Sequence, residues 1–326
     1  MAPQQGTLLS YRPDIKVVDA TLRDGGLVNN FYFTDKFVKK LYQTNVKAGV
    51  DYMELGYKAS KELFDVDKFG KWKFCDEEDI RKIVGNNDSN LKLSVMADVG
   101  RTDLEHDILD KKDSVIDLVR VATYINTIPA AIDMAEYCKA KGYETSINIM
   151  AISTSSDKDI RQALELIGQS GTDMIYIVDS YGSMYPEQIR ELSEMYLEIG
   201  GKYGKKIGMH AHNNQQMAFA NTIEATAQGV SMLDATMCGM GRGAGNCSME
   251  ALLGFLKNPK YRIAPVLKFI QEEMLKLRED GLVWGYDIPY LLTGILNVHP
   301  RSAIEAIQNN NTDYLDFYQN LWDKEC

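Results

Sequence analysis

The chain has 326 residues, enough for one large domain or two ordinary ones, and a closed α/β barrel needs about 250 residues. Its formal net charge of −10 is not offset by any basic block or basic-aromatic stripe, so we expect no nucleic-acid partner. No window approaches about 18 uninterrupted apolar residues, which argues against a membrane span. Five widely spaced cysteines are typical of reduced thiols, and without an export signal we expect a cytoplasmic protein.

The chain divides into a polar start, a long alternating stretch and a helical end. Residues 1–15 contain two prolines and are interpreted as an N-terminal arm. Eight apolar runs are then predicted strands, namely 16–22, 51–57, 91–97, 115–122, 145–150, 174–178, the run ending at His210 and His212, and 232–237. Helices are predicted between them over 34–48, 77–84, 128–140, 157–169, 186–203 and 215–228.

This alternation of strand and helix indicates a TIM (β/α)8 barrel over 16–258, with a parallel sheet, rather than a meander. It stops after Pro259. Apolar residues from Ile263 to Leu277 fall on one helical face, and three short helices are predicted over 289–296, 302–307 and 314–322. We therefore expect a C-terminal helical region over 259–326.

Polar residues just past each strand of a parallel barrel converge at one end, where the active site lies. His210 and His212 are two apart at the end of a strand, so both imidazoles point to one side, which suits metal binding. The alternative is that they are merely two polar residues at a strand end. A carboxylate and two imidazoles, with an amide oxygen in reserve, form an N/O ligand set that favours Mn²⁺ or Mg²⁺ over a structural Zn²⁺.

Other polar residues reach the same end of the barrel. Arg23 beside a metal would provide a second fixed positive charge for a developing enolate oxygen. Arg242, between glycines, is predicted to touch an anionic substrate. Lys58 either contacts a substrate carboxylate or is a solvated lysine at a strand end, and Tyr124 follows the fourth strand.

Five segments carry a resemblance to a known family, and they occur in the same order over about 230 residues. They are DATLRDG (19–25), RVAT (120–123), DSYGSM (179–184), GMHAHNN (208–214) and GMGRGAGN (239–246). The chain thereby resembles the metal-dependent barrel lyases that include HMG-CoA lyase, and within them most of all the 4-hydroxy-2-oxovalerate aldolases.

The resemblance implies a role for each matching residue. Asp24, His210 and His212 would be metal ligands, and Asn246 a further ligand or an anchor of the glycine loop. Arg23 would stabilise the enolate, and Ser180 would contact the carboxylate of a 2-oxo acid. The segment WGYDIPY is also similar to the family's C-terminal part, where Tyr290 matches a tyrosine that reaches the site.

The chain departs from the aldolases at the residue expected to transfer a proton. They carry a histidine three residues after the motif aspartate, where this chain has Leu27, and their RVATH reads RVATY here, ending at Tyr124. We rank Tyr290 first as the replacement base, His299 second and Tyr124 third. His299 could equally be a residue that simply ends a helix before Pro300.

The sequence therefore predicts a divalent-metal-dependent aldolase that acts on a 4-hydroxy-2-oxo acid through a pyruvate-like enolate and releases an aldehyde. An acyl-CoA-dependent transferase that condenses a 2-oxo acid is the alternative, but the RDGEQ motif of such enzymes is absent. A barrel that keeps its metal only as a binding protein is a third reading. We expect the partners to be small molecules, a 2-oxo acid and an aldehyde. The sequence is also compatible with a homodimer and with a partner enzyme that accepts the aldehyde.

Overall fold

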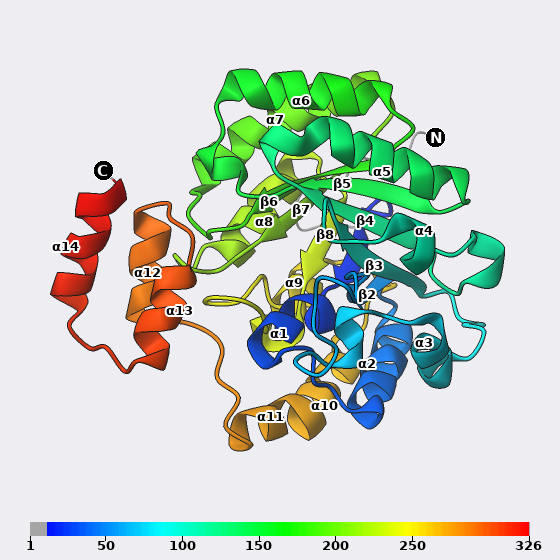
Figure 1. Ribbon diagram of the computed structural model, residues 1–326, viewed down its shortest axis with the longest axis horizontal. Helices are drawn as coiled ribbons and strands as arrows, with labels where there is room; N and C mark the ends of the chain where they lie inside the picture. Colours follow the sequence, from blue (N-terminus) through cyan, green and yellow to red (C-terminus); the bar gives the residue numbers. More distant parts are fainter. Residues whose placement is uncertain (1–11, 326) are drawn as a thin grey trace.

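The computed structural model describes residues 12–325, and its centre is a closed barrel of eight parallel strands (Figure 1). Each strand pairs with the next, and β8 pairs with β1 to close the sheet. The strands are β1 Lys16–Asp19, β2 Tyr52–Tyr57, β3 Lys92–Asp98, β4 Leu118–Thr123, β5 Glu144–Ile149, β6 Met174–Asp179, β7 Lys206–Ala211 and β8 Met232–Ala235. The predicted fold class is confirmed.

Helices surround the barrel, as expected when a right-handed crossover joins each parallel strand to the next. They are α1 Thr21–Asn29, α2 Asp35–Ala48, α3 Glu77–Val84, α4 Leu104–Asp107, α5 Ile128–Ala140, α6 Asp157–Gln169, α7 Pro186–Lys202, α8 Ala218–Gln228 and α9 Met249–Phe255. The predicted bounds of α3, α5 and α6 agree with the structure to the residue. Capping explains two of the starts, because the Thr34 and Ser156 side chains accept backbone N–H bonds at the beginning of α2 and α6.

The first predicted strand is too long. It was expected to reach residue 22, but β1 ends at Asp19 and α1 begins at Thr21. The Asp19 carboxylate accepts hydrogen bonds from the backbone N–H and the hydroxyl of Thr21, which turns the chain at this point. Arg23 and Asp24 consequently lie on the first turn of a helix above the barrel.

The barrel interior has an apolar layer and a charged layer. Buried side chains such as Val18, Leu118 and Met232 fill one end. Towards the mouth, Arg120 is fully buried and donates to Glu54 (2.9 Å) and to Asp234 (2.6 Å). The strands therefore enclose paired charges directly beneath the active-site end, a feature that the strand pattern alone did not predict.

The chain after the barrel forms α10 Ile263–Phe269, a π-helical segment Ile270–Met274, α11 Leu275–Glu279, α12 Ile288–Ile295, α13 Arg301–Gln308 and α14 Tyr314–Glu325. Helix α10 packs on α2, where the rings of Phe37 and Phe269 lie 5.3 Å apart. Helices α12–α14 stand together at one side of the molecule (Figure 1). Within residues 12–325, no helix combines the length and the apolar character needed to cross a membrane.

Candidate metal centre and active site

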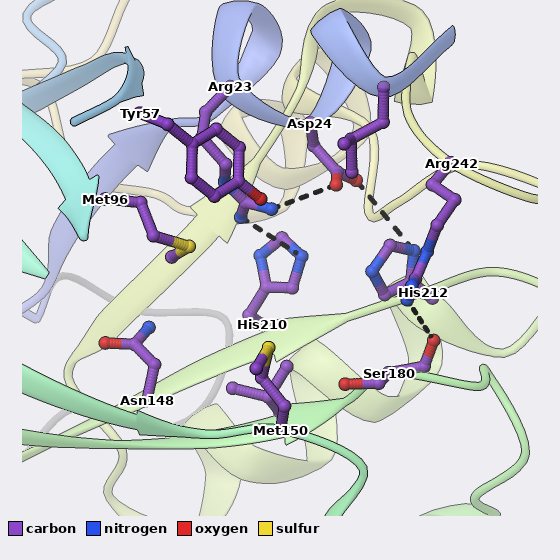
Figure 2. A pocket seen from close by; sticks show the side chains of 12 residues that line it. Arg23, Asp24, Tyr57, Met96, Asn148, Met150, Ser180, His210, His212 and Arg242 are labelled. Atoms are coloured by element: carbon purple, nitrogen blue, oxygen red, sulfur yellow. Dashed lines mark hydrogen bonds and ion pairs between the residues drawn. The ribbon is translucent and has the colours of Figure 1, made fainter. Parts of the chain in front are cut away.

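The three predicted metal ligands meet at the mouth of the barrel. Asp24 from α1, His210 from β7 and His212 just beyond β7 offer ligand atoms that all lie within 4.8 Å of one another. All three side chains are buried, with exposed fractions of 0%, 3% and 4%. Residues far apart in the sequence thus form one small cluster of a carboxylate and two imidazoles (Figure 2).

The protonation of the cluster suits a cation. Burial lowers the pKa of His212 well below its usual value, so its imidazole is neutral and keeps a lone pair at neutral pH. Burial alone would raise the pKa of Asp24, but the neighbouring positive charges outweigh it, so this pKa is lowered and the group is a carboxylate. Nδ1 of His210 lies 2.9 Å from Oδ2 of Asp234. A proton on Nδ1 donated to that carboxylate leaves Nε2 free to bind a metal.

Asn246 lies beside this cluster. Its Nδ2 donates to Asp24 and to the carbonyl of Met240 (3.2 Å), whereas its buried Oδ1 has no hydrogen-bond partner among the described residues. An orphaned buried oxygen beside a carboxylate and two imidazoles fits a hard divalent cation. A Cβ at Gly241 would lie 2.0 Å from Nδ2 of Asn246 and 2.4 Å from Oδ2 of Asp24, so only glycine leaves room for this contact.

Arg23 is fixed beside the ligands. Its Nε donates to Glu54 (2.8 Å) and its Nη1 to Asp24 (2.9 Å), while Nη2 lies 3.5 Å from Nε2 of His210. Glu54 also binds Arg120, which in turn binds Asp234 behind His210. A continuous chain of buried ion pairs and one hydrogen bond therefore runs from Arg23 to His210 and holds both in place.

The cavity at this mouth contains several residues that were predicted and several that were not. Asp24, Arg23, His210, His212, Ser180 and Arg242 line it. So does Leu27, at the position where the related aldolases were expected to carry a histidine. The lining residues that we did not identify from the sequence are Tyr57, Met96, Asn148, Met150 and Val178. Each lies in a predicted strand, so the sequence indicated that these residues are near the barrel. It did not show which of their side chains point into the cavity.

Five predicted site residues are not among those that line the cavity, namely Asn246, described above, and four others. Lys58 is buried and donates from Nζ to the carbonyl of Cys75 (2.8 Å), so the reading of a solvated lysine is wrong. Tyr124 is 48% exposed after β4. Tyr290 is half-buried on α12. His299 reaches the site indirectly, because its Nε2 lies 3.4 Å from Nη1 of Arg242.

Cys238 and Cys247 flank the glycine loop but do not have the character of nucleophiles. Burial raises the pKa of the Cys238 thiol to about 11 and that of Cys247 to about 12. Both therefore stay protonated at neutral pH and act as packing residues. The donor set of the site is made of nitrogen and oxygen.

The chain is similar to several known proteins over most of its length. An oxaloacetate decarboxylase of Mycobacterium tuberculosis is 30% identical over 244 residues, 74% of this chain and 69% of that protein. A 4-hydroxy-2-oxovalerate aldolase of Bacillus cereus is 27% identical over 323 residues, covering 94% of this chain and 89% of that protein.

Among solved structures, the N-terminal domain of a candidate aldolase from Bacteroides vulgatus superposes with a TM-score of 0.77 at 28% identity, over 90% of this chain and 96% of that one. Hydroxymethylglutaryl-CoA lyase from Pseudomonas aeruginosa shares the fold, with a TM-score of 0.67 at 16% identity over 86% and 96% of the two chains. The HMGL-like family model matches residues 14–271. The chain belongs to the HMGL-like family.

Proposed function

We propose that this chain is a divalent-metal-dependent lyase, an aldolase that cleaves a 4-hydroxy-2-oxo acid through a pyruvate-like enolate. The observation that carries the proposal is the cluster of Asp24, His210 and His212 with Arg23 held beside it. The related proteins support it, since their names describe an aldolase and a decarboxylase, both of which cleave a carbon–carbon bond of a 2-oxo acid. The condensing transferase has less support.

Asp24, His210, His212 and Asn246 would hold a divalent ion, which would supply a Lewis acid for the 2-oxo group. The C3–C4 bond then breaks, its electron pair becomes the C2–C3 double bond, and negative charge gathers on the C2 oxygen. The hydroxyl on C4 loses its proton and becomes the aldehyde carbonyl. Protonation of the enolate at C3 yields pyruvate.

Arg23 stabilises the negative charge that develops on the C2 oxygen as the C3–C4 bond breaks. Two carboxylates occupy its Nε and Nη1, so the guanidinium cannot turn, and Nη2 remains available on the side of His210. A donor that is already oriented stabilises the enolate oxygen without reorganisation during the reaction. Ser180, whose backbone carbonyl binds Arg242, lines the opposite part of the cavity and is proposed to contact the substrate carboxylate.

The base that takes the 4-hydroxyl proton stays a prediction, with Tyr290 ahead of His299 and Tyr124. Burial raises the pKa of Tyr290, so its hydroxyl would receive a proton only transiently, as part of a relay. His299 is neutral at neutral pH because burial, Arg242 and Arg301 lower its pKa to about 4.

A second reaction is favoured by one specific observation. The apolar side chain of Leu27 lines the cavity where a base was expected, and the cavity's two imidazoles both belong to the metal-ligand cluster. Decarboxylation of a 2-oxo diacid forms the same enolate by losing CO₂ and needs no base for a hydroxyl. The decarboxylase relative is consistent with this alternative.

We further propose that the ion is Mn²⁺ or Mg²⁺, because oxygen and imidazole ligands suit these ions. We also propose that the enzyme works in the cytoplasm on a small 2-oxo acid and an aldehyde. A homodimer and an aldehyde-accepting partner enzyme belong to the same proposal.

The deciding experiment follows pyruvate formation by purified protein with Mn²⁺ or Mg²⁺, offered a panel of 4-hydroxy-2-oxo acids and, separately, oxaloacetate. Exchange of the pyruvate methyl protons in deuterium oxide reports enolate formation without knowledge of the aldehyde. We expect metal-dependent exchange and cleavage of at least one substrate. A metal-loaded protein that neither exchanges nor cleaves would overturn the proposal.

A further inference from the structure

The guanidinium of Arg242, at the mouth of the cavity, has N–H groups that donate to no acceptor among the described residues. It lies in the glycine loop after β8, and its Nη2 donates to the backbone carbonyl of Ser180 (2.8 Å). Its Nε is buried and has no hydrogen-bond partner in the described part of the chain. Across residues 12–325, no carboxylate forms an ion pair with its guanidinium. A cation that lines a cavity without a carboxylate partner is suited to binding an anion.

The contact between Arg242 and His299 also lacks an acceptor. Nδ1 of His299 accepts the backbone N–H of Arg301 (3.1 Å), so a neutral ring carries its proton on Nε2. That nitrogen lies 3.4 Å from Nη1 of Arg242, which is itself a donor. Two donors do not bond to each other, so both remain available to an acceptor placed beside them.

The segment that carries His299 is fixed on the barrel mouth. Nε2 of Gln215, just after β7, donates to the carbonyl of Gly294 (3.2 Å). Nδ2 of Asn297 donates to the carbonyl of Ser153 (3.1 Å), and the Ser183 hydroxyl donates to Oδ1 of Asn297 (2.7 Å). These bonds to the loops after β5, β6 and β7 set the position of His299 before a ligand binds, which reduces the cost of binding.

The two arginines of the cavity stand on different sides of the metal-ligand cluster. Arg23 is placed on the side of His210, whereas Arg242 is placed on the side of His212 (Figure 2). If Arg23 receives the enolate oxygen, a group bound by Arg242 belongs to another part of the substrate. That assignment rests on the proposed function.

We propose that Arg242 and His299 form a carboxylate subsite, so that the natural substrate is a 2-oxo acid with a second carboxylate on the part that leaves. The aldol product is then a carbonyl compound that bears a carboxylate, and in the decarboxylation the second carboxylate leaves as CO₂. Arg242 determines specificity by direct contact. His299 contributes one further donor beside the guanidinium.

The test compares two ligands that differ only in the second carboxylate. 2-Oxoglutarate and 2-oxovalerate have the same chain length, and neither has the 4-hydroxyl needed for cleavage, so calorimetry with Mn²⁺-loaded protein measures binding alone. We expect wild type to prefer 2-oxoglutarate by on the order of 10- to 100-fold, the value of a charged hydrogen bond. Arg242→Gln should abolish the preference, His299→Ala should reduce it, and Arg262→Gln, at an exposed arginine, should retain it.

Equal affinity of wild type for the two ligands would overturn the subsite, as would a preference that survives in Arg242→Gln. The pyruvate methyl exchange separates this outcome from failure of the proposed function, because exchange requires the metal ligands and Arg23 but no second carboxylate. Loss of exchange in wild type contradicts the lyase, whereas normal exchange with no ligand preference contradicts the subsite alone. Arg242→Lys, which keeps the charge but not the planar fork, should give an intermediate preference if the variant with glutamine folds poorly.

Discussion

Arg23 is held by two carboxylates, and this arrangement makes a sharp prediction about its variants. Arg23→Ala should retain the metal but lose turnover by on the order of 10²-fold or more, because its contact is made with charge that develops in the transition state. Metal analysis and pyruvate methyl exchange measure the two effects separately. A variant within a few-fold of wild type in exchange would mean that Arg23 serves only the ion-pair chain through Glu54.

Metal binding is expected to need Asp24, His210 and His212 together. Asp24→Asn and His212→Ala should each lose stoichiometric metal, since removing one of three protein ligands leaves a labile site. Elemental analysis after gel filtration is the measurement. His106→Ala is the matched control, because His106 lies on the surface with its ring bonded to Asp103, and this variant should stay fully loaded. Full occupancy in both ligand variants would disprove the assignment.

The base can be identified from kinetics in paired variants. If Tyr290 transfers the hydroxyl proton, Tyr290→Phe should depress aldol cleavage while pyruvate exchange and pyruvate binding stay close to wild type. His299→Ala should behave in that way only if His299 is the base. A histidine that serves the carboxylate subsite would instead change the preference between mono- and dicarboxylic substrates. Wild-type rates of aldol cleavage in both variants would show that neither residue takes the hydroxyl proton.

The sequence was informative about residues whose chemistry is local and less so about residues whose partners are distant. His210 and His212 could be recognised because two imidazoles on one side of a strand suit a metal wherever the rest of the site comes from. Glu54, Arg120 and Asp234 could not, since strand periodicity shows that a side chain faces inward but not which charge it meets across a barrel. The same limit applies to His299, whose contact with Arg242 depends on how α12 docks.

At the scale of elements, the glycine loop after β8 controls how closely the chain approaches the metal ligands. Gly241→Ala should displace Asn246 or Asp24, because the new Cβ would lie within 2.4 Å of atoms of both. We expect weaker metal binding, measured by competition with a chelator. Gly201→Ala is the matched control, since it lies in α7 with open space around its Cβ, and it should leave metal binding unchanged and raise stability by about 0.5–1 kcal/mol. Equal metal affinity in the two variants would contradict this account.

The sequence predicts the boundary of an element well where a side chain caps a helix. It predicts the boundary poorly where a tertiary contact determines where the element ends. Ser156 marks the start of α6 in the sequence itself. The end of β1 could not be read in the same way, because apolar Leu22 continues the strand pattern while the bonds of Asp19 to Thr21 and of Asn45 to Asp19 (2.5 Å) favour a turn. The helix predicted from Ile263 to Leu277 is present, but the same pattern could not reveal its π-helical segment at 270–274.

At the scale of the molecule, the buried ion pairs should matter more to stability than the surface ones. Arg120→Met leaves Glu54 and Asp234 buried with fewer partners, and we expect a loss of about 3–5 kcal/mol in the free energy of unfolding. Arg190→Met is the control, because Arg190 is half-exposed in its pair with Glu224, and it should cost no more than about 1 kcal/mol. Urea denaturation at fixed metal concentration gives both values. Similar losses in the two variants would show that the charged layer does not stabilise the barrel as argued.

The pairing of β1 with β8 closes the barrel, and it also sets an order of events during synthesis. Strand β1 leaves the ribosome first but needs both β2 and β8 as neighbours, and β8 is made last. At about 5–20 residues per second, one edge of the nascent sheet stays open for on the order of 10–40 s. Asp24 is made early, and Asn246 follows only after β8, so the complete set of proposed ligands exists only once translation of the barrel has ended. We therefore expect metal loading to be a late step in the life of the nascent chain, and we expect the open strand edge to be exposed to aggregation until then.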